Sequence, residues 1–505
     1  MRSIVRKIIV ILGGYPDVGK GLLTATISYL LKINNYSVFP VKFDGYLNNN
    51  SEYMNPYEKP PEMKYANEEV FVLDDGFCGD ADSGTYERFL DIHLGANHNI
   101  TGGQLFEQMA KMGKSNSHGE ILKIAHLRQI CREKLLQLSS NYDFLVVEIG
   151  GTIGDEENSY FIETLRDLRD TDVEIVFSVI GPLLSLFPKQ DSMISAETKM
   201  IRMAVCALNR IGIVPEFLFC RSFGTDELFA KNIKLLEHEC NIMRENIFLI
   251  PQVKLSYELP AILESQGFLN ILTEKIESSK KIISSGYLER FIGKVGEIRG
   301  NLNIFVIGET VSCDSFVSLN EAILHAGVHL KHLPELTWRT SKEVIDGSRS
   351  TIDGVIITEN AGQISNLIML ISKFVSEGIP VLGISKGALP IAAFLTGKKG
   401  EMISKRTELF TGASTITLSN EKLVEEYGTQ SISERYRCNF HFSKEIQELL
   451  AANKEIFGST GDHPEIIGRI SQNILATRAH PEYNSTPNKP NAIISLFVSQ
   501  CIANQ

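Results

Sequence analysis

The sequence lacks several features that would have pointed to a function class at once. Its eight cysteines form no C-x-x-C pair and have no neighbouring histidine ladder. In a chain of 505 residues we therefore expect reduced, mostly buried thiols in a cytoplasmic protein. No segment approaches the roughly 18 apolar residues that a membrane span needs. The net charge of -11 argues against a nucleic-acid binder, although a small phosphate pocket needs only a few local donors.

The N-terminus superficially resembles a signal peptide, but we do not expect it to be one. Basic residues precede an apolar run, but the run from Ile8 to Leu12 is too short for the hydrophobic region of a signal sequence and leads into a glycine loop. Internal repeats and low-complexity tracts are absent as well. The sequence therefore predicts no membrane and no nucleic-acid partner.

Two α/β blocks are present, and a charged stretch separates them. Short apolar runs alternate with helix-like stretches, a pattern that indicates parallel sheets covered on both faces. The strands expected in the first block are 7–12, 37–43, 144–150, 173–180, 216–222 and 246–253. Those expected in the second are 303–309, 354–360, 380–385 and 476–482. We predict a first domain over 1–268, a linker over 269–297 and a second domain over 298–505.

A phosphate-binding loop is predicted at the start of the first block. Gly14-Tyr-Pro-Asp-Val-Gly-Lys20 matches G-x-x-x-x-G-K, directly after an apolar run and before a helix-like run. Backbone amides and the helix N-terminus can wrap phosphates there, and Lys20 supplies charge. A chance glycine turn is the alternative. The residues expected to hold the phosphates of a nucleotide cofactor are Gly14, Val18, Gly19, Lys20, Gly21 and Leu22.

Two carboxylates are candidate Mg²⁺ ligands. Asp82 and Glu148 lie near predicted strand ends, and Mg²⁺ takes one or two carboxylates together with waters and substrate phosphates. Loop carboxylates are often only solvated, which is the alternative for Asp82. Glu148 closes an apolar strand, where a charge needs a partner. Gly21 stands where a P-loop usually has Ser or Thr, and Thr24 lies one turn further on.

Four segments of the first block resemble the amidoligase domain of CTP synthase over residues 5–265. They are KFDGYLN, the stretch from VLDDG to DADSGTYERF, VVEIGGTIGDEEN, and LPAILESQG, of which VEIGGTIGD is the most specific. The second block resembles the class I glutamine amidotransferase domain of the same family. The resemblance implies an α/β architecture: a P-loop parallel-sheet amidoligase domain followed by a flavodoxin-like amidotransferase domain.

That resemblance also implies a chemistry and roles for residues. ATP phosphorylates the C4 oxygen of a uracil ring, and ammonia then displaces phosphate. Lys20 would hold ATP phosphates, and Lys42 would stabilise charge during phosphoryl transfer. Asp82 and Glu148 would ligate Mg²⁺, and Asp155 and Glu157 fall on pyrimidine-nucleotide contacts. A homotetramer or homodimer, with the nucleotide site shared between subunits, is expected.

Departures from the family pattern put the pyrimidine substrate in question. The family's loop is longer and rich in serine, whereas here Tyr15-Pro-Asp17 fills the space. The family's K-T-K-P-T-Q segment aligns with 197–202, so that Glu197 replaces a lysine. Lys189 could restore the charge, and UTP or a related pyrimidine both remain possible. The residues expected to bind the substrate from this region are Thr198, Lys199, Arg202 and Lys234.

The second block contains G-I-S-K-G, a match to the G-x-S-x-G nucleophile elbow, with Ser385 where the family has its catalytic cysteine. His480 and Glu482 retain the family's H-P-E motif. The oxyanion segment reads Thr358-Glu-Asn-Ala-Gly362 in place of paired glycines, and Leu389 replaces a glutamine. Because a serine hydroxyl is also a weaker nucleophile than a thiol, we expect an inactive glutaminase. A Ser-His-Glu hydrolase is the alternative.

The sequence therefore predicts an ATP- and Mg²⁺-dependent C–N ligase that does not depend on glutamine. It would aminate UTP or a related pyrimidine with ammonia or another amine. A nucleotide-binding paralogue that regulates or assembles with a CTP synthase, without turnover, is the competing hypothesis, favoured by Asp17 and Glu197.

Overall fold

The computed structural model describes residues 6–51, 69–115, 123–169, 171, 173–185, 196–222, 226–276, 286–308, 316–346, 351–358, 361–398 and 403–505. The chain forms two compact units. Unit 1 contains 1–50 and 97–289, and unit 2 contains 51–96 and 290–505. The units therefore differ from the division predicted at residue 268, because the stretch 51–96 groups with the C-terminal part of the chain.

Unit 1 is built on a sheet in the order β10-β9-β7-β1-β6-β2-β5. All neighbours on this path pair in parallel, and β8 adds an antiparallel pair to β7. Residues 8–12 of β1 are almost fully buried, as expected for a central strand covered on both faces. The strands are β1 (Arg6–Gly13), β2 (Val38–Asp44), β5 (Asn99–Thr101), β6 (Phe144–Ile149), β7 (Val173–Ser185), β8 (Ala196–Glu197), β9 (Phe217–Ser222) and β10 (Ile247–Ile250).

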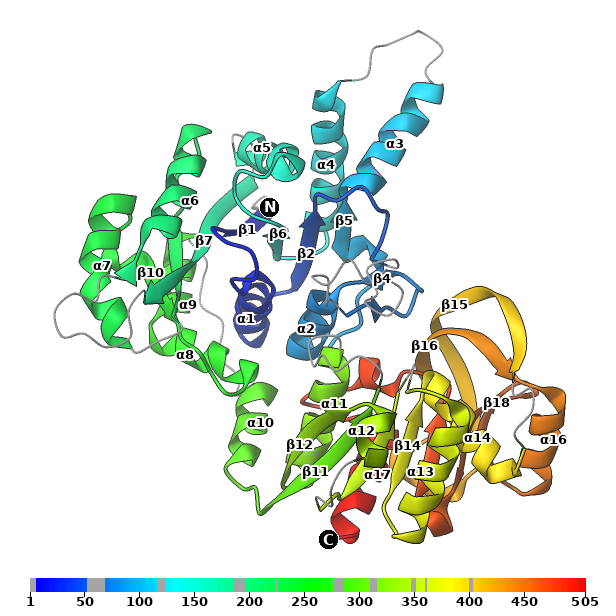
Figure 1. Ribbon diagram of the computed structural model, residues 1–505. Helices are drawn as coiled ribbons and strands as arrows, with labels where there is room; N and C mark the ends of the chain where they lie inside the picture. Colours follow the sequence, from blue (N-terminus) through cyan, green and yellow to red (C-terminus); the bar gives the residue numbers. More distant parts are fainter. Residues whose placement is uncertain are drawn as a thin grey trace. The chain divides into compact units, whose positions relative to one another are not determined.

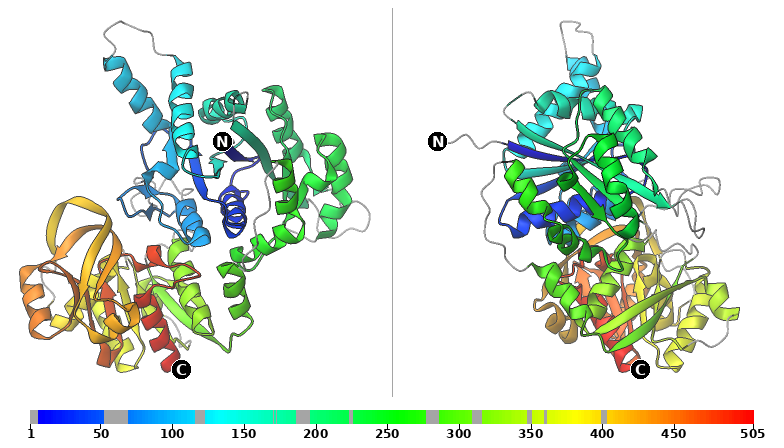
Figure 2. Two further views of the ribbon diagram at one scale, coloured as in Figure 1. Left: turned by 180° about the vertical axis from the view of Figure 1, so that it is seen from behind. Right: turned by 90° about the vertical axis from the view of Figure 1, so that its left-hand side faces the viewer.

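The helices of unit 1 follow the strands as crossovers, which produces the predicted parallel α/β fold (Figure 1). They are α1 (Lys20–Ile33), α3 (Gly102–Ser115), α4 (Ile124–Ser139), α5 (Ser159–Arg169), α6 (Lys199–Arg210), α7 (Asp226–Cys240), α8 (Leu259–Ser265) and α9 (Phe268–Lys275). Helices α3 and α4 lie side by side in both directions of view (Figure 2). Helix α10 (Tyr287–Val295) falls within the predicted linker and spans the division between the units.

Unit 2 has a parallel core in the order β12-β11-β13-β14-β19. Numbered by their appearance in this core, the strands follow the order 2-1-3-4-5, which is the flavodoxin-like order predicted from the sequence. The strands are β11 (Gly300–Ile307), β12 (His332–Arg339), β13 (Gly354–Ile357), β14 (Val381–Ile384) and β19 (Ile474–Thr477). Its helices are α11 (Val317–His329), α12 (Ser341–Asp346), α13 (Ile364–Ser376), α14 (Ala388–Thr396), α15 (Glu421–Tyr427), α16 (Lys444–Ala452) and α17 (Ala492–Ala503).

An antiparallel extension continues this sheet from β19 through β18, β17 and β15 to β16. Its strands are β15 (Ile403–Leu418), β16 (Ser431–Phe442), β17 (Ile456–Thr460) and β18 (His463–Arg469). The stretch 69–96 adds a small hairpin, β3 (Phe71–Val72) and β4 (Cys78–Gly79), followed by α2 (Ala81–Leu90). The hydrophobic core of unit 2 packs between its sheet and helices α11, α13, α14 and α17.

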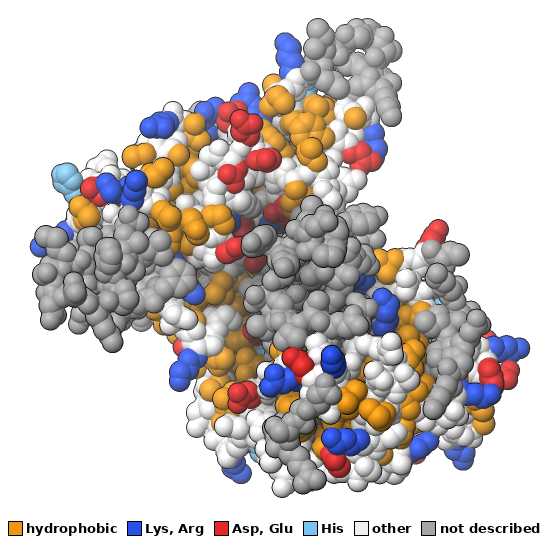
Figure 3. Space-filling view, viewed as in Figure 1, with side chains coloured by type: hydrophobic (Ala, Val, Ile, Leu, Met, Phe, Trp, Pro, Cys, Tyr) orange, Lys and Arg blue, Asp and Glu red, His pale blue; other side chains and the backbone are white. Residues whose placement is uncertain are grey.

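The surface carries charges of both signs. On the face shown in Figure 3, basic and acidic side chains are interspersed, and no single basic field covers it. In the part of the chain that is described, no helix is both long and apolar enough to cross a bilayer. Cys206 is exposed, and the other six described cysteines are buried, in agreement with the expectation of mostly buried thiols.

Candidate active site

The predicted phosphate loop connects β1 to α1 in unit 1. The backbone N–H of Gly14 donates to the carbonyl of Ile180 at 2.8 Å, which ties the start of the loop to β7. Gly19 adopts a left-handed conformation with φ of 95° and caps α1, so that Lys20 is the first helical residue. The Lys20 Nζ donates to the carbonyl of Gly151 at 2.8 Å. The loop therefore presents a helix N-terminus and a buried ammonium beside the loop that follows β6.

The other predicted loop residues differ in their exposure to solvent. Val18 is buried, Gly21 is buried in the first turn of α1, and Leu22 is half-buried. Asp17 is exposed and has a positive φ of 51°, in the left-handed region that Asp adopts more readily than most residues. A carboxylate at the tip of a phosphate loop is the feature that sequence analysis singled out as unusual.

Lys42 and Glu148 form a buried pair on neighbouring strands. They face each other in the parallel register of β2 and β6, with Lys42 Nζ 3.8 Å from Glu148 Oε1. Lys42 is 5% exposed and Glu148 is 2% exposed. Lys42 is therefore the partner that a charge closing an apolar strand requires. The geometry leaves a carboxylate and an ammonium at the strand ends beside the phosphate loop, as phosphoryl transfer needs.

The residues present fit a magnesium nucleotide. Thr24 Oγ1 is buried one turn into α1 and has no hydrogen-bond partner among the residues that the structure describes. The described residues contain no group of three or more His, Cys, Asp or Glu side chains that could hold a metal ion by themselves. Mg²⁺ commonly takes only one or two carboxylates and completes its shell with waters and phosphate oxygens. Glu148 can supply one, and Asp82 lies on α2 in unit 2, so that their pairing stays a prediction.

Asp155 and Glu157, the predicted pyrimidine contacts, follow the same loop. Asp155 accepts from Thr152 twice, from its backbone N–H at 2.6 Å and from its hydroxyl at 2.8 Å. It therefore stabilises its own turn in this structure. Glu157 is exposed. The role of both residues in nucleotide binding stays a prediction.

The remaining predicted substrate residues lie on or before α6 and α7. Thr198 is buried directly before α6, and Lys199 and Lys234 are exposed. Arg202 is engaged by Glu239 of α7, with Nε 2.9 Å from Oε2 and Nη1 3.2 Å from Oε1. Sequence reasoning missed Glu239, since nothing local to Arg202 identifies a partner 37 residues away. Lys189 lies outside the described residues.

The G-I-S-K-G segment forms a genuine elbow at the carboxyl end of β14. Ser385 is fully buried and has φ of 54°, a strained value for a residue other than glycine. A Cβ placed on Gly387 would lie 1.9 Å from the carbonyl oxygen of Ile357, so the elbow packs directly against the end of β13. Ser385 therefore lies in the strained turn that a nucleophile elbow requires, and its expected place at the family's cysteine position stays a prediction.

His480 and Glu482, the predicted partners of Ser385, are in direct contact with each other. His480 Nδ1 and Glu482 Oε1 are 2.8 Å apart, and the backbone N–H of His480 donates to the carbonyl of Arg435 at 2.8 Å. Leu389 is buried in the first turn of α14. Residues 359 and 360 of the predicted oxyanion segment lie outside the described residues, so the expected loss of the oxyanion donors stays a prediction.

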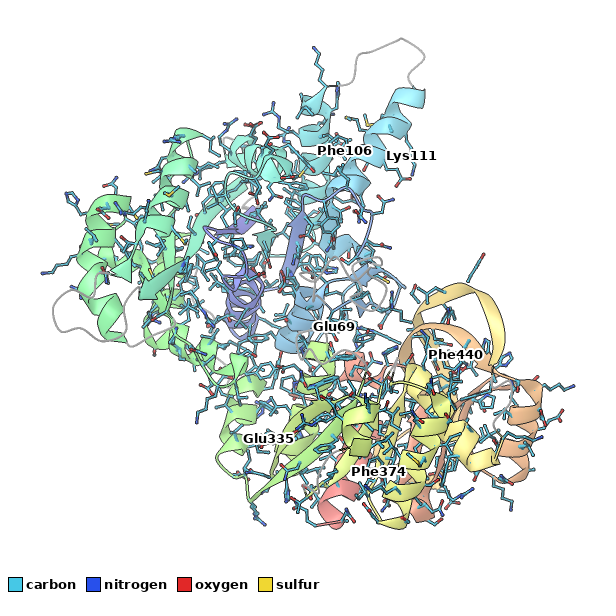
Figure 4. The ribbon with its side chains drawn as sticks, in the orientation of Figure 1. Glu69, Phe106, Lys111, Glu335, Phe374 and Phe440 are labelled. Carbon is cyan, nitrogen blue, oxygen red and sulfur yellow. The ribbon has the colours of Figure 1, made fainter. Side chains whose placement is uncertain are left out.

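Sequence reasoning missed Glu69, labelled in Figure 4, a carboxyl that feels the charge of Glu482. Glu69 is buried and accepts from the backbone N–H of Ser318 at 3.1 Å and from its hydroxyl at 2.9 Å. Burial raises its pKa to about 7, opposed by Arg88 and Ser318 and reinforced by Glu482. The surrounding sequence, ANEEV, has an ordinary charged composition that does not distinguish this residue.

Comparison with known proteins agrees with the geometry. A family model described as the CTP synthase N-terminus matches residues 6–278. The chain belongs to the CTP synthase family. A second model, described as glutamine amidotransferase class-I, matches residues 311–500. The resemblance predicted from the sequence is thereby confirmed for both blocks, and with it a ligase family of pyrimidine nucleotide metabolism.

The relatives extend over nearly the whole chain. It is 30% identical over 537 residues to the CTP synthase of Sulfurisphaera tokodaii, covering 97% of this chain and 98% of that protein. It is 26% identical over 538 residues to the CTP synthase of Dehalococcoides mccartyi, covering 98% and 96%. Among solved structures, the glutaminase domain of Trypanosoma brucei CTPS with bound acivicin aligns with a TM-score of 0.35 and 15% identity, over 40% of this chain and 94% of that chain.

Proposed function

We propose that this chain is an ATP- and Mg²⁺-dependent amidoligase that replaces the C4 oxygen of UTP, or a related pyrimidine nucleotide, with nitrogen from ammonia or another amine rather than from glutamine. The family membership and the buried set of Lys20, Lys42 and Glu148 support the ligase. The proposal that the nitrogen does not come from glutamine rests on the serine at the elbow, which stands in the place of the family's cysteine.

The chain's own residues suit the first half of the reaction. ATP with Mg²⁺ supplies, when bound, the phosphoryl group that makes the C4 oxygen a leaving group. Lys20 would exchange the carbonyl of Gly151 for phosphate oxygens, and Glu148 and Asp82 would hold the metal. Lys42, already paired with a carboxylate, would remain charged and neutralise the transferring group.

The second half of the reaction would draw on free ammonia. A serine hydroxyl needs a base and oxyanion donors to attack an amide, and it is far less ionised at neutral pH than a thiol. The pair of His480 and Glu482 is retained, but Leu389 stands where the family has a glutamine. We therefore assign unit 2 no glutaminase activity.

The test compares nitrogen donors with purified full-length protein. With ATP, Mg²⁺, UTP and ammonium, we expect ADP and CTP in equal amounts. With glutamine at the same concentration and ammonium removed enzymatically, we expect neither product above background. Absence of ADP with every pyrimidine nucleotide and amine tried would overturn the ligase, and CTP formation from glutamine alone would overturn the nitrogen source.

A second function, nucleotide binding without turnover, is favoured by two observations. Arg202 is occupied by Glu239, and Asp17 places a carboxylate in the phosphate loop. This alternative predicts that calorimetry detects binding of ATP or CTP while no ADP forms. The third possibility, a Ser-His-Glu hydrolase, rests on the strained elbow and predicts that a fluorophosphonate probe labels Ser385 but not the Ser385→Ala variant.

A further inference from the structure

Arg435 is a fully buried arginine on β16, and the side-chain partners found for it among the described residues come from the stretch 69–96. Its Nη1 and Nη2 donate to Glu87 Oε2 and Oε1 at 2.8 and 3.1 Å, a bidentate pair. Its Nε donates to Asp74 Oδ1 at 2.5 Å. The guanidinium also lies 5.4 Å from the centroid of the Phe71 ring. All of these residues belong to unit 2.

The β3–β4 hairpin, which contains Phe71 and Asp74, also forms hydrogen bonds to β15. The Thr411 hydroxyl donates to the carbonyl of Gly76 at 2.9 Å, and the backbone N–H of Ala413 donates to the carbonyl of Asp74 at 3.0 Å. Gly76 and Gly412 have φ of 88° and 110°, and a Cβ on Gly412 would lie 3.0 Å from Gly76 Cα. Side chains at either position would separate the two backbones, so this contact depends on glycine.

The loop after His480 holds the other end of the same segment. Asp91, which follows α2, accepts from the Thr486 hydroxyl and from Asn488 Nδ2, both at 2.8 Å. The Tyr483 hydroxyl donates to the carbonyl of Val70 at 2.9 Å. The stretch 69–96 is therefore bound by β15, β16 and the 483–488 loop together.

Helix α2 contains both Glu87, the partner of Arg435, and Asp82, a candidate metal ligand. Glu87, which Arg435 holds, lies five residues after Asp82 on the same helix. Asp80 caps the helix by accepting from the backbone N–H of Asp82 at 3.1 Å. Both residues lie on one helix of ten residues with a fixed rise and turn, so a shift of the helix at Glu87 would also move Asp82.

We propose that Arg435 is a positioning residue for the ligase reaction. It fixes α2, and thereby the candidate metal ligand Asp82, through the ion pair with Glu87. The inference rests on the role of Asp82 in the proposed function.

Arg435→Met tests the inference, and Arg478→Met is the matched control. Arg478 is 1% exposed, its Nη1 donates to Glu465 Oε1 at 2.8 Å, and its guanidinium lies 5.2 Å from the Phe440 ring centroid. Its partners come from β16 and β18 instead of α2. Both variants leave a buried glutamate without its arginine and should destabilise unit 2 to a similar degree. Glu87→Gln is a milder variant, because glutamine keeps an accepting oxygen and Arg435 keeps the carboxylate of Asp74 as a partner.

Two readouts on the full chain need no turnover. Hydrogen exchange reports whether α2 loosens, and calorimetry reports the Mg²⁺ concentration that half-saturates ATP binding. In Arg435→Met and, more weakly, Glu87→Gln, we expect faster exchange over 81–90 and a requirement for Mg²⁺ raised about tenfold or more. Arg478→Met should leave both values close to wild type, and Arg435→Lys should recover part of the loss.

An unchanged Mg²⁺ requirement in Arg435→Met, or an equal rise in Arg478→Met, would show a merely structural arginine and overturn the inference. A wild type that binds Mg²⁺ and ATP but forms no product would count against the proposed function alone. A wild type that binds no Mg²⁺ with ATP would remove the role of Asp82 and overturn the inference as well.

Discussion

At the scale of single residues, the buried carboxyl of Glu69 makes the free energy of unfolding depend on pH. Its pKa is raised from 4.5 to about 7 because burial outweighs the hydrogen bonds from Ser318. The folded protein therefore favours the protonated carboxyl. This contribution is fully present below about pH 4.5 and is lost as the pH rises through about 7, a total of about 3 kcal/mol.

Glu69→Gln should remove this dependence. Glutamine keeps an accepting oxygen for Ser318 and carries no charge, so the free energy of unfolding should fall less than in wild type between about pH 5 and 8. Urea denaturation across that range measures the slope. If the free energy of unfolding changed with pH equally in the two proteins, Glu69 would not be the source of the pH dependence.

Lys20 carries the charge of the phosphate loop. Its ammonium reaches the carbonyl of Gly151 at 2.8 Å, so it is placed at the strand ends without a nucleotide. Lys20→Met should lower kcat/KM for ATP by about 10²-fold or more, because developing phosphate charge loses its main side-chain partner. Lys32→Met, in the last turn of the same helix, is the control and should behave as wild type.

At the scale of elements, the ion pair between α6 and α7 tests the substrate prediction. Glu239 compensates the charge of Arg202. If Arg202 contacts the nucleotide phosphates, Glu239→Gln should lower KM for UTP several-fold and Arg202→Gln should raise it, and both effects should shrink at high salt. Steady-state kinetics at two salt concentrations give the values. No change in KM with either variant would remove Arg202 from the site.

The central strands of the sheets could be predicted from the sequence, because buried strands appear there as continuous apolar runs. Residues 8–12 and 144–147 are such runs. A glycine loop follows the first run, and Glu148 follows the second run within β6. The antiparallel strands could not be predicted in this way, since β15 and β16 mix charged, polar and apolar residues. Arg435 looks like an exposed strand residue until Asp74, 361 positions earlier, is placed beside it.

At the scale of the whole molecule, the two compact units differ from the two blocks of the sequence. The stretch 51–96 precedes most of the first block's strands but belongs to unit 2. A division at residue 268 therefore separates Glu87 from its partner Arg435. It also separates Glu69 from its partner Ser318.

A chain that ends at residue 297 should consequently keep the strands of unit 1 but lose the fold of residues 69–96. Buried carboxyls without their partners would favour an open segment. Hydrogen exchange should show rapid exchange over 69–96 and slow exchange in β1 and β6. Slow exchange over 69–96 in the truncated chain would contradict the assignment of this stretch to unit 2.

The nitrogen source is the central claim for the whole protein. Full-length protein supplied with ATP, Mg²⁺, UTP, unlabelled ammonium and glutamine carrying ¹⁵N in its amide group can form CTP from either donor. Mass spectrometry of the product then identifies the source of the C4 amino group. The account predicts CTP without the label, and CTP that carries ¹⁵N from glutamine would contradict it.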